Sequence, residues 1–353
     1  MGLTVSATTL AVALMAPFIG VVADVLGRKR IITTALFALG LPTALIAAAD
    51  TLQQIVVLRF IQGLLLPPVF AVAVAYIGDE WPRDRIAGVT ALYTTGSIVG
   101  GFLGRFIAGW VADYSGWREA FLVLAALNLV GALIVVALLP RERNFVRAGG
   151  LIESTRLMSR HFRDPRLVAT FAVGFGTLSC FVTLFTFINF YLAAPPFGLS
   201  AAGLGSLFVV YLFGAFVTPL IGRLVGRFGR RRLVMVAIAA WAAGLLFTLI
   251  PNLSAIFVGL VIAACSGFIC QAVSTGYIAF AATSARSSAV GLYVTAYYLG
   301  GSAGAVVGGV AWHWFGWSGC VVQVWIVLAI MGMIVLHFWR ELPPAMGAAR
   351  AMR

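Results

Sequence analysis

Two arginines lie inside long apolar stretches of this chain, where an isolated charge is unfavourable. Arg59 falls within the apolar run 54–77, and Arg105 falls within the run 86–112. An arginine near the centre of a membrane-spanning helix costs about 2.5–3.5 kcal/mol, and such residues usually face a water-filled pathway or a partner. Because a guanidinium keeps its proton, the pair can bind an anionic group, but neither arginine can carry a proton.

Acidic residues do not accompany these arginines at depth. All eleven acids of the chain lie in connections or near the ends of apolar runs. Asp113 and His313 stand 200 positions apart, at equivalent places in two similar segments. Both are candidates for coupling or substrate binding, together with the two arginines.

Further polar and aromatic residues interrupt the apolar runs and are candidates to line a substrate cavity. Gln62 and Gly63 share a helical face with Arg59, about one turn further along. Ligand pockets combine apolar walls with a few polar groups. The predicted cavity residues are Thr183, Thr186, Asn189, Gln271, Tyr293 and Tyr297.

Catalytic and metal-binding patterns are absent from the sequence. No nucleotide-binding loop, catalytic triad or zinc motif occurs, and the four cysteines have no metal-ligand spacing. We therefore predict a protein that is not an enzyme and that binds neither a metal nor a cofactor.

Membrane-spanning helices must position these residues. The chain is 62% hydrophobic and 10% charged, whereas soluble domains average about 45–50% and about 25%. Eleven apolar runs reach about 20 residues, enough for a helix to cross a hydrocarbon core of about 30 Å. Because lipid offers backbone groups no partners, the sequence predicts an all-α membrane protein. Its spans lie near 5–26, 31–49, 54–77, 86–112, 119–139, 167–193, 201–225, 233–250, 254–282, 288–312 and 319–339.

Basic residues concentrate in alternate connections between the spans. Of 24 lysines and arginines, 21 fall in these connections or in the C-terminal tail. This asymmetry follows the positive-inside rule and predicts that the Arg-rich loops and the C-terminus are cytoplasmic, in a bacterial inner membrane. The net charge of +13 is thus explained by the lipid bilayer, and we expect no nucleic-acid partner.

Two internal repeats divide the chain. PFIGVVADVLGRKR at 17–30 recurs as PLIGRLVGRFGRRR at 219–232, and GGFLGRFIAGWVADYSGW at 100–117 recurs as GGSAGAVVGGVAWHWFGW at 300–317. Repeats of this kind are typical of secondary transporters. We expect two pseudo-symmetric halves at 1–139 and 167–340, a linker at 140–166 and a tail at 341–353. The span 167–193 has no partner in the first half, so we expect an ancestral fold of twelve helices whose first helix this chain lacks.

Three segments resemble the major facilitator superfamily. GVVADVLGRKR at 20–30 is similar to its loop signature, RFIQG at 59–63 is similar to the R-x-x-Q-G of its fourth helix, and GSIVGGFLGR at 96–105 aligns with the glycine-rich motif of drug antiporters. In that last motif Gly101 replaces the proline and Arg105 replaces the final glycine. The whole chain looks most like the bacterial drug- and arabinose-efflux-like (acriflavine-sensitivity) branch.

The loop signature also predicts a conformational latch. A carboxylate there can pair with a nearby arginine or cap a helix N-terminus, and a glycine permits the tight turn. Contacts of about 1–3 kcal/mol each can bias one conformation without freezing it. The predicted latch residues are Gly20, Asp24, Gly27, Arg28, Lys29 and Arg30.

The resemblance implies a monomeric secondary transporter that exports small amphipathic or sugar-like solutes by alternating access, driven by protons. Proton coupling requires an acid or histidine acting with Arg59. That group could stand in a helix absent from this chain, or could be Asp24, Asp113 or His313. Otherwise Arg59 and Arg105 make the protein an organic-anion carrier. A third alternative is a truncated membrane protein that does not transport.

Overall fold

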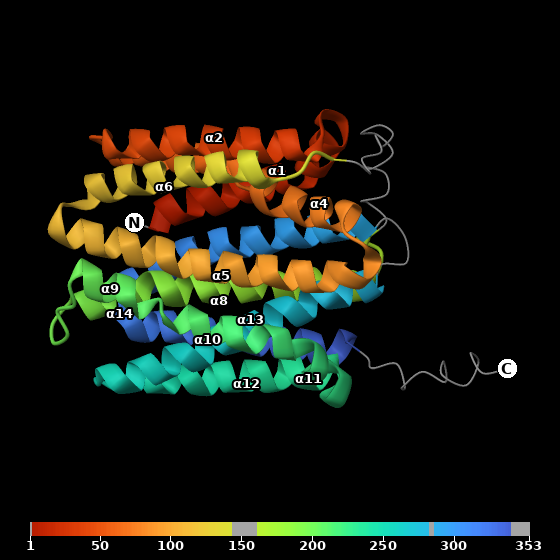
Figure 1. Ribbon diagram of the computed structural model, residues 1–353. Coiled ribbons are helices and arrows are strands. Elements are labelled where there is room, and N and C mark those ends of the chain that lie inside the picture. The colour runs from red at the N-terminus through yellow and green to blue at the C-terminus, as the bar shows by residue number, and fades with distance from the viewer. Residues whose placement is uncertain (1, 143–160, 282–285, 340–353) are drawn as a thin grey trace.

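The computed structural model describes residues 2–142, 161–281 and 286–339, and these residues form a bundle of helices without a strand (Figure 1). The first repeat contains α1 (Gly2–Leu26), α2 (Arg28–Ala47), α3 (Leu52–Leu65), the π-helix η1 (Pro68–Val72), α4 (Ala73–Glu80), α5 (Arg83–Tyr114) and α6 (Trp117–Leu138). The second contains α8 (Pro165–Ala193), α9 (Ala201–Leu207), α10 (Val210–Val217), the 3-10 turn η2 (Thr218–Leu220), α11 (Ile221–Phe228), α12 (Arg230–Thr248), α13 (Leu253–Ala281) and α14 (Arg286–Phe338).

Every one of the predicted spans falls on a helical segment, so the all-α membrane fold is confirmed. Within the described residues, nine helical stretches are long and apolar enough to cross a bilayer. The last of them, Ala289–Phe338, covers two predicted spans, and α5 is not among the nine. The predicted linker and the predicted tail lie largely outside the described residues.

Local backbone features break the spans where the sequence shows only apolar runs. The run 54–77 is divided by η1, which begins at Pro68, because proline cannot donate the backbone hydrogen bond that a continuous α-helix needs. The helix α14 contains Gly316 in a non-helical conformation with φ 61°. There the chain doubles back, so that the Cys320 thiol contacts the Gly308 carbonyl oxygen at 3.6 Å.

Alternate connections gather at the same end of the bundle, as Figure 1 shows. At one end lie the turns around residues 27, 81 and 229 and the end of α14, and we name this the basic end. The turns around residues 49, 115, 196 and 251 lie at the other end, here named the opposite end. The helical bundle therefore keeps most of the arginines on one side.

Local geometry repeats between the two parts of the chain. Gly27 and Gly229 both adopt positive φ, at 92° and 79°, directly before a helix. The Lys29 ammonium then donates to the Val136 carbonyl at 3.2 Å, and the Arg231 guanidinium donates to the Leu336 carbonyl at 2.7 Å. In each repeat a basic residue thus binds the last turn of the closing helix, because helix ends leave carbonyls without intrahelical partners.

The helix α8 distinguishes the second repeat from the first. Gly300 and Gly304 of α14 lie directly against the α8 backbone at Phe175 and Ser179. Their counterparts Gly100 and Gly104 on α5 face open space. Small residues let membrane helices approach closely, and of these two glycine pairs only the one in the second repeat is used in this way.

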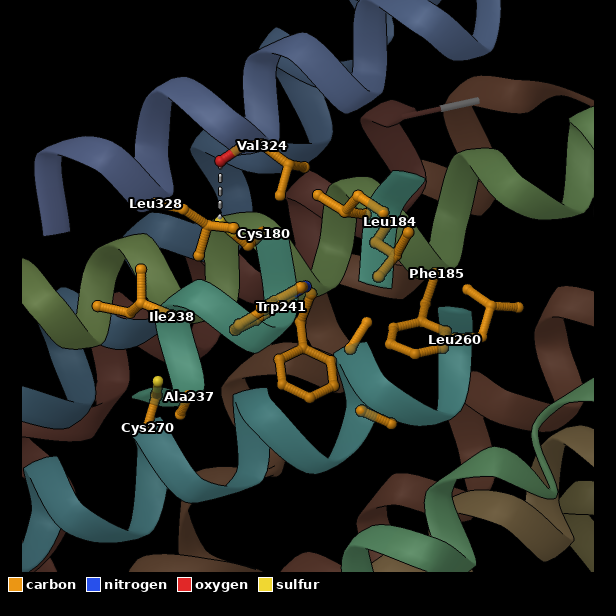
Figure 2. Close-up of a cluster of buried hydrophobic side chains, with 14 of the residues drawn as sticks. Cys180, Leu184, Phe185, Ala237, Ile238, Trp241, Leu260, Cys270, Val324 and Leu328 are labelled. Atoms are coloured by element: carbon orange, nitrogen blue, oxygen red, sulfur yellow. Dashed lines mark hydrogen bonds between the residues drawn. The ribbon is translucent and has the colours of Figure 1, made fainter. Parts of the chain in front are cut away.

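Apolar side chains fill the interior of the second repeat. Trp241 of α12 is fully buried in this apolar cluster (Figure 2). The centre of its ring lies 5.3 Å from that of Phe181 on α8, which lies 5.3 Å from that of Phe268 on α13. Cys180 and Cys270 are buried in the same cluster, and the Cys180 thiol contacts the Val324 carbonyl oxygen at 3.9 Å. These thiols pack as apolar groups.

Candidate functional site

Arg59 lies on α3, about 10 Å along the helix from its first residue, Leu52, at the opposite end. Its guanidinium donates to the Gln62 side-chain oxygen at 3.3 Å and stands 5.2 Å from the centre of the Phe121 ring on α6. Gln62 in turn donates to the Thr43 hydroxyl at 2.7 Å. Arg59 and Gln62, which were predicted to share a helical face, therefore form a hydrogen bond that orients the guanidinium.

Gly63 has a packing role beside this pair. A Cβ on Gly63 would collide with the backbone of Thr8 and lie 2.7 Å from the Ala11 Cβ. The helix α3 therefore lies against α1 at this glycine, as expected where small residues bring membrane helices together.

Arg105 lies on α5, about 13 Å along the helix from Tyr114 at the opposite end. It donates to the Gly101 carbonyl at 2.9 Å. Its guanidinium stands over two rings of the second repeat, at 4.8 Å from the centre of Phe208 and 5.4 Å from that of Tyr211. Cation–π contacts of this kind stabilise a guanidinium by about 0.5–2 kcal/mol.

The two arginines lie at similar depth, about 10 and 13 Å along their helices from the opposite end, and their like charges repel each other. We name Arg59, Arg105 and the rings of Phe121, Phe208 and Tyr211 the arginine site. It joins both repeats, whereas the ion pairs Arg28–Asp79 and Arg118–Asp50 lie at the two ends of the bundle. The sequence showed the two arginines but gave no signal for the three rings.

Tyrosines continue the site toward the middle of the bundle. Tyr297 stacks with Tyr293 at 5.9 Å and meets Tyr298 edge-on at 5.6 Å between ring centres. Tyr298 stacks at 5.6 Å on Phe70 of η1, across the two repeats. Tyr293 and Tyr297 are nearly buried, with 4% and 9% of their surface exposed, so they form a wall rather than an open lining.

The remaining predicted cavity residues are dispersed within the second repeat. Thr183 is fully buried and donates to the Gly304 carbonyl at 3.0 Å, while Gln323 donates to Thr183 at 3.3 Å. Asn189 donates to the Phe185 carbonyl of its own helix at 2.6 Å. Through these hydrogen bonds Thr183 links α8 to α14. Thr186 and Gln271 are half-buried on α8 and α13.

Asp113 and His313 lie apart from the arginine site. Both are exposed at the opposite end, on α5 and on the first part of α14. Asp113 is about 12 Å along the helix from Arg105. The structure therefore places these two coupling candidates at a helix end.

Partners of the predicted latch lie at the basic end. The Arg28 guanidinium pairs with the Asp79 carboxylate at 2.8 Å. Gly27 has the positive φ expected for the turn, and Arg30 is exposed. Gly20 and Asp24 fall within α1, but their surroundings lie outside the part of the chain that the structure describes.

Glu142 binds the predicted latch segment, a contact that the sequence did not reveal. Its carboxylate accepts the Lys29 backbone N–H at 2.6 Å, next to Gly27 and at the start of α2. Lys29 also donates to the Val136 and Leu139 carbonyls at the end of α6, and the Tyr76 hydroxyl donates to the Pro140 carbonyl at 2.8 Å. The start of the linker is thereby fixed to the first repeat, through contacts more than 60 residues apart in sequence.

Contacts between the repeats gather at the opposite end. A Cβ on Gly109 would lie 2.5 Å from the Ala201 carbonyl oxygen and 2.9 Å from Gly205 Cα, so α5 and α9 touch through their backbones. Trp110 donates to the Ser206 hydroxyl at 3.2 Å. Ser6 and Ser302 share a hydrogen bond of 2.6 Å between α1 and α14.

Glycines nearer the basic end have no such contacts. Gly88 and Gly96 on α5 have open space where a side chain would stand, as do Gly276 on α13 and Gly291 on α14. Among the described glycines of α5, Gly109 alone meets the backbone of another helix.

Comparison with known proteins decides the family. The family model described as Major Facilitator Superfamily matches residues 1–207 and again residues 177–352. The chain belongs to the major facilitator superfamily. It is 33% identical to the inner membrane transport protein YnfM of Escherichia coli K12, over 96% of this chain and 81% of that protein. It is 31% identical to an uncharacterized transporter of Buchnera aphidicola from Schizaphis graminum, over 95% of this chain and 81% of that protein.

A solved structure shows the same fold. The nucleoside transporter NupG, solved as a point mutant, superposes with a TM-score of 0.76 at 15% identity, over 96% of this chain and 91% of that one. This major facilitator is thus a multi-span membrane transporter of small molecules and not an enzyme.

Proposed function

We propose that this major facilitator carries small amphipathic organic anions by alternating access, with the anionic group bound between Arg59 and Arg105. One observation carries the proposal: two guanidinium groups on different helices lie at similar depth between the ends of the bundle and repel each other, while the ion pairs Arg28–Asp79 and Arg118–Asp50 lie at its ends. Two like charges at this depth are unfavourable, and a bound carboxylate or phosphate relieves both charges at once.

The rings around the guanidinium groups favour a substrate with a flat apolar part. Phe121 lies on the first repeat, while Phe208 and Tyr211 lie on the second. A substrate with an aromatic ring and an anionic group matches this arrangement, because guanidinium forks bind carboxylates while rings stack on apolar faces. A neutral sugar-like solute would leave the positive charges unmatched.

Proton-coupled efflux is the second candidate for the energy source and direction. It is favoured by the R-x-x-Q-G segment, in which Arg59 and Gln62 form a hydrogen bond, and by the resemblance to the drug- and arabinose-efflux-like branch. The proton-binding group would have to lie apart from the arginine site, at Asp24, Asp113 or His313, or outside the described residues.

The arrangement of the repeats supports a rocking cycle. We place the basic end in the cytoplasm on the positive-inside rule, with halves at 1–139 and 167–340 joined by the linker 140–166. With this orientation, the contact of Gly109 with α9 closes the outer side. This corresponds to an inward-open state of the monomer.

Binding of an aromatic carboxylate tests the proposal. Purified protein in detergent is heated with salicylate or with the neutral analogue salicylamide. We expect salicylate to raise the midpoint of thermal unfolding and salicylamide to have little effect, because a ligand stabilises the state that binds it. Proteoliposomes loaded with salicylate then report exchange of labelled salicylate with the medium.

Equal stabilisation by both compounds would contradict binding through the arginines. Exchange of salicylate that is insensitive to an imposed pH gradient would argue against proton coupling while leaving the anion carrier intact. Absence of exchange for salicylate, for larger aromatic carboxylates and for neutral amphipathic compounds would favour the non-transporting alternative.

A further inference from the structure

An apolar groove runs along the surface of the second repeat, between α12 and the second part of α14. Its volume is about 580 Å³. Small residues leave it open, because Ala239, Ala243, Ala329 and Gly332 provide little side chain to fill it. The lining residues are Met235, Ile238, Ala239, Ala242, Ala243 and Leu246 on α12, and Trp325, Leu328, Ala329, Gly332, Met333 and Leu336 on α14.

The groove begins at the basic end and has the length of one leaflet. On α12 its lining runs from Met235 to Leu246, and on α14 from Leu336 to Trp325. Eleven residues at 1.5 Å rise give about 17 Å, which is close to half of a hydrocarbon core of about 30 Å. The indole N–H of Trp325 already donates a hydrogen bond to the Ala242 carbonyl at 3.0 Å. The other lining side chains are apolar, so the walls of the groove suit an acyl chain.

Two arginines stand where the headgroup of such a lipid would lie. Arg231 and Arg232 precede Met235 by four and three residues, which places them on the same face of α12. The Arg231 guanidinium donates to the carbonyl of Leu336, a lining residue, at 2.7 Å, so its side chain lies at the mouth of the groove. Arg232 is exposed.

The two helices that form the groove carry charge of one sign. Neither α12 nor α14 contains an aspartate or glutamate, and five arginines fall between residues 223 and 232. A zwitterionic headgroup offers no net charge to this surface, whereas an anionic one does. Each basic residue near a membrane surface contributes about 1 kcal/mol toward anionic lipid.

We propose that this groove is a binding site for an anionic phospholipid, which places one acyl chain between α12 and α14 and its phosphate at Arg231 and Arg232. The site is separate from the arginine site and does not depend on the substrate. The lipid joins the two helices on the outer surface of the second repeat, where direct side-chain contact is interrupted.

Native mass spectrometry of the full chain tests this site. The protein is purified in detergent and incubated with an equal mixture of phosphatidylglycerol and phosphatidylcholine. We expect wild type to retain phosphatidylglycerol preferentially. The double variant Arg231→Gln/Arg232→Gln should bind it about twenty-five-fold more weakly, since each arginine contributes about fivefold. The matched control Arg163→Gln/Arg166→Gln removes two exposed arginines at the start of α8 and should leave retention unchanged.

A variant that fills the groove tests the proposal independently of the arginines. Ala239→Leu, at an exposed lining position, should reduce retention of both lipids without changing the elution volume of the protein. Equal retention of the two lipids by wild type would overturn the proposal, as would unchanged phosphatidylglycerol binding by the arginine variant. A dimer that Ala239→Leu dissociates would instead assign the groove to a second copy of the chain.

Discussion

At the residue scale, Arg59 and Arg105 form the proposed anion site. Arg105 occupies a position where the antiporter motif has glycine, and its guanidinium reaches across to Phe208 and Tyr211 of the other repeat. The Arg105 side chain thereby connects the proposed substrate site to both repeats. Sequence alone located the two arginines but not their neighbours, because Arg105 and Phe208 are about 100 positions apart and nothing in either local pattern links them.

Replacing Arg105 should remove substrate binding without unfolding the protein. For Arg105→Gln we expect the dissociation constant of salicylate to rise about tenfold to a hundredfold, since a charge-assisted hydrogen bond contributes about 1.5–3 kcal/mol. The midpoint of thermal unfolding without ligand should be unchanged or higher, because the variant removes the repulsion between Arg105 and Arg59. Calorimetric titration measures the first quantity and a melting curve the second.

Arg118→Gln is the control for that variant. Arg118 is also an arginine near the opposite end, but it pairs with Asp50 on the surface. Salicylate affinity should remain at the wild-type value in this variant. An equal loss of affinity in both variants would show that the effect is a general one of positive charge.

At the element scale, the latch shows which parts of a motif a sequence can predict. Gly27 was expected to turn the chain and does so with φ 92°. Asp79 and Glu142, which bind Arg28 and Lys29, were not recognised, since their roles depend on how α4 and the end of α6 pack. In the same way the helical segments were predictable from apolar length, whereas the breaks at η1 and η2 depend on local prolines and packing.

The ion pairs at the two ends of the bundle should differ in how much they contribute to stability and transport. The side chains of Arg28 and Asp79 are 16% and 35% exposed at 2.8 Å, whereas those of Arg118 and Asp50 are 46% and 84% exposed at 3.3 Å. Exposed pairs contribute about 0–1 kcal/mol. We therefore expect Asp79→Asn to slow transport and lower the thermal midpoint by several degrees, and Asp50→Asn to change neither. Melting curves measure the thermal midpoint, and proteoliposome exchange measures the transport rate. A larger effect of Asp50→Asn than of Asp79→Asn would contradict the latch.

At the scale of the whole molecule, Gly109 of α5 meets the α9 backbone near the opposite end, whereas Gly88 and Gly96 nearer the basic end have open space beside them. The internal repeats predicted two related bundles, and the matching turns at Gly27 and Gly229 support that prediction. Which end is closed could not be predicted, because Gly109 and Gly104 are equally small in the sequence. Only the packing shows that the first touches α9 and the second does not.

Distances between spin labels at the two ends test alternating access most directly. Pulsed electron resonance on cysteine-free protein would use one pair across the opposite end, at Tyr114 and Ser200, and one across the basic end, at Arg85 and Phe228. Gly109→Val places a larger side chain against the α9 backbone, and Gly104→Ala, which has open space, is its control. The account predicts that Gly109→Val lengthens the first distance and shortens the second, while Gly104→Ala changes neither. Movement at one end alone, or at both ends in the same sense, would contradict it.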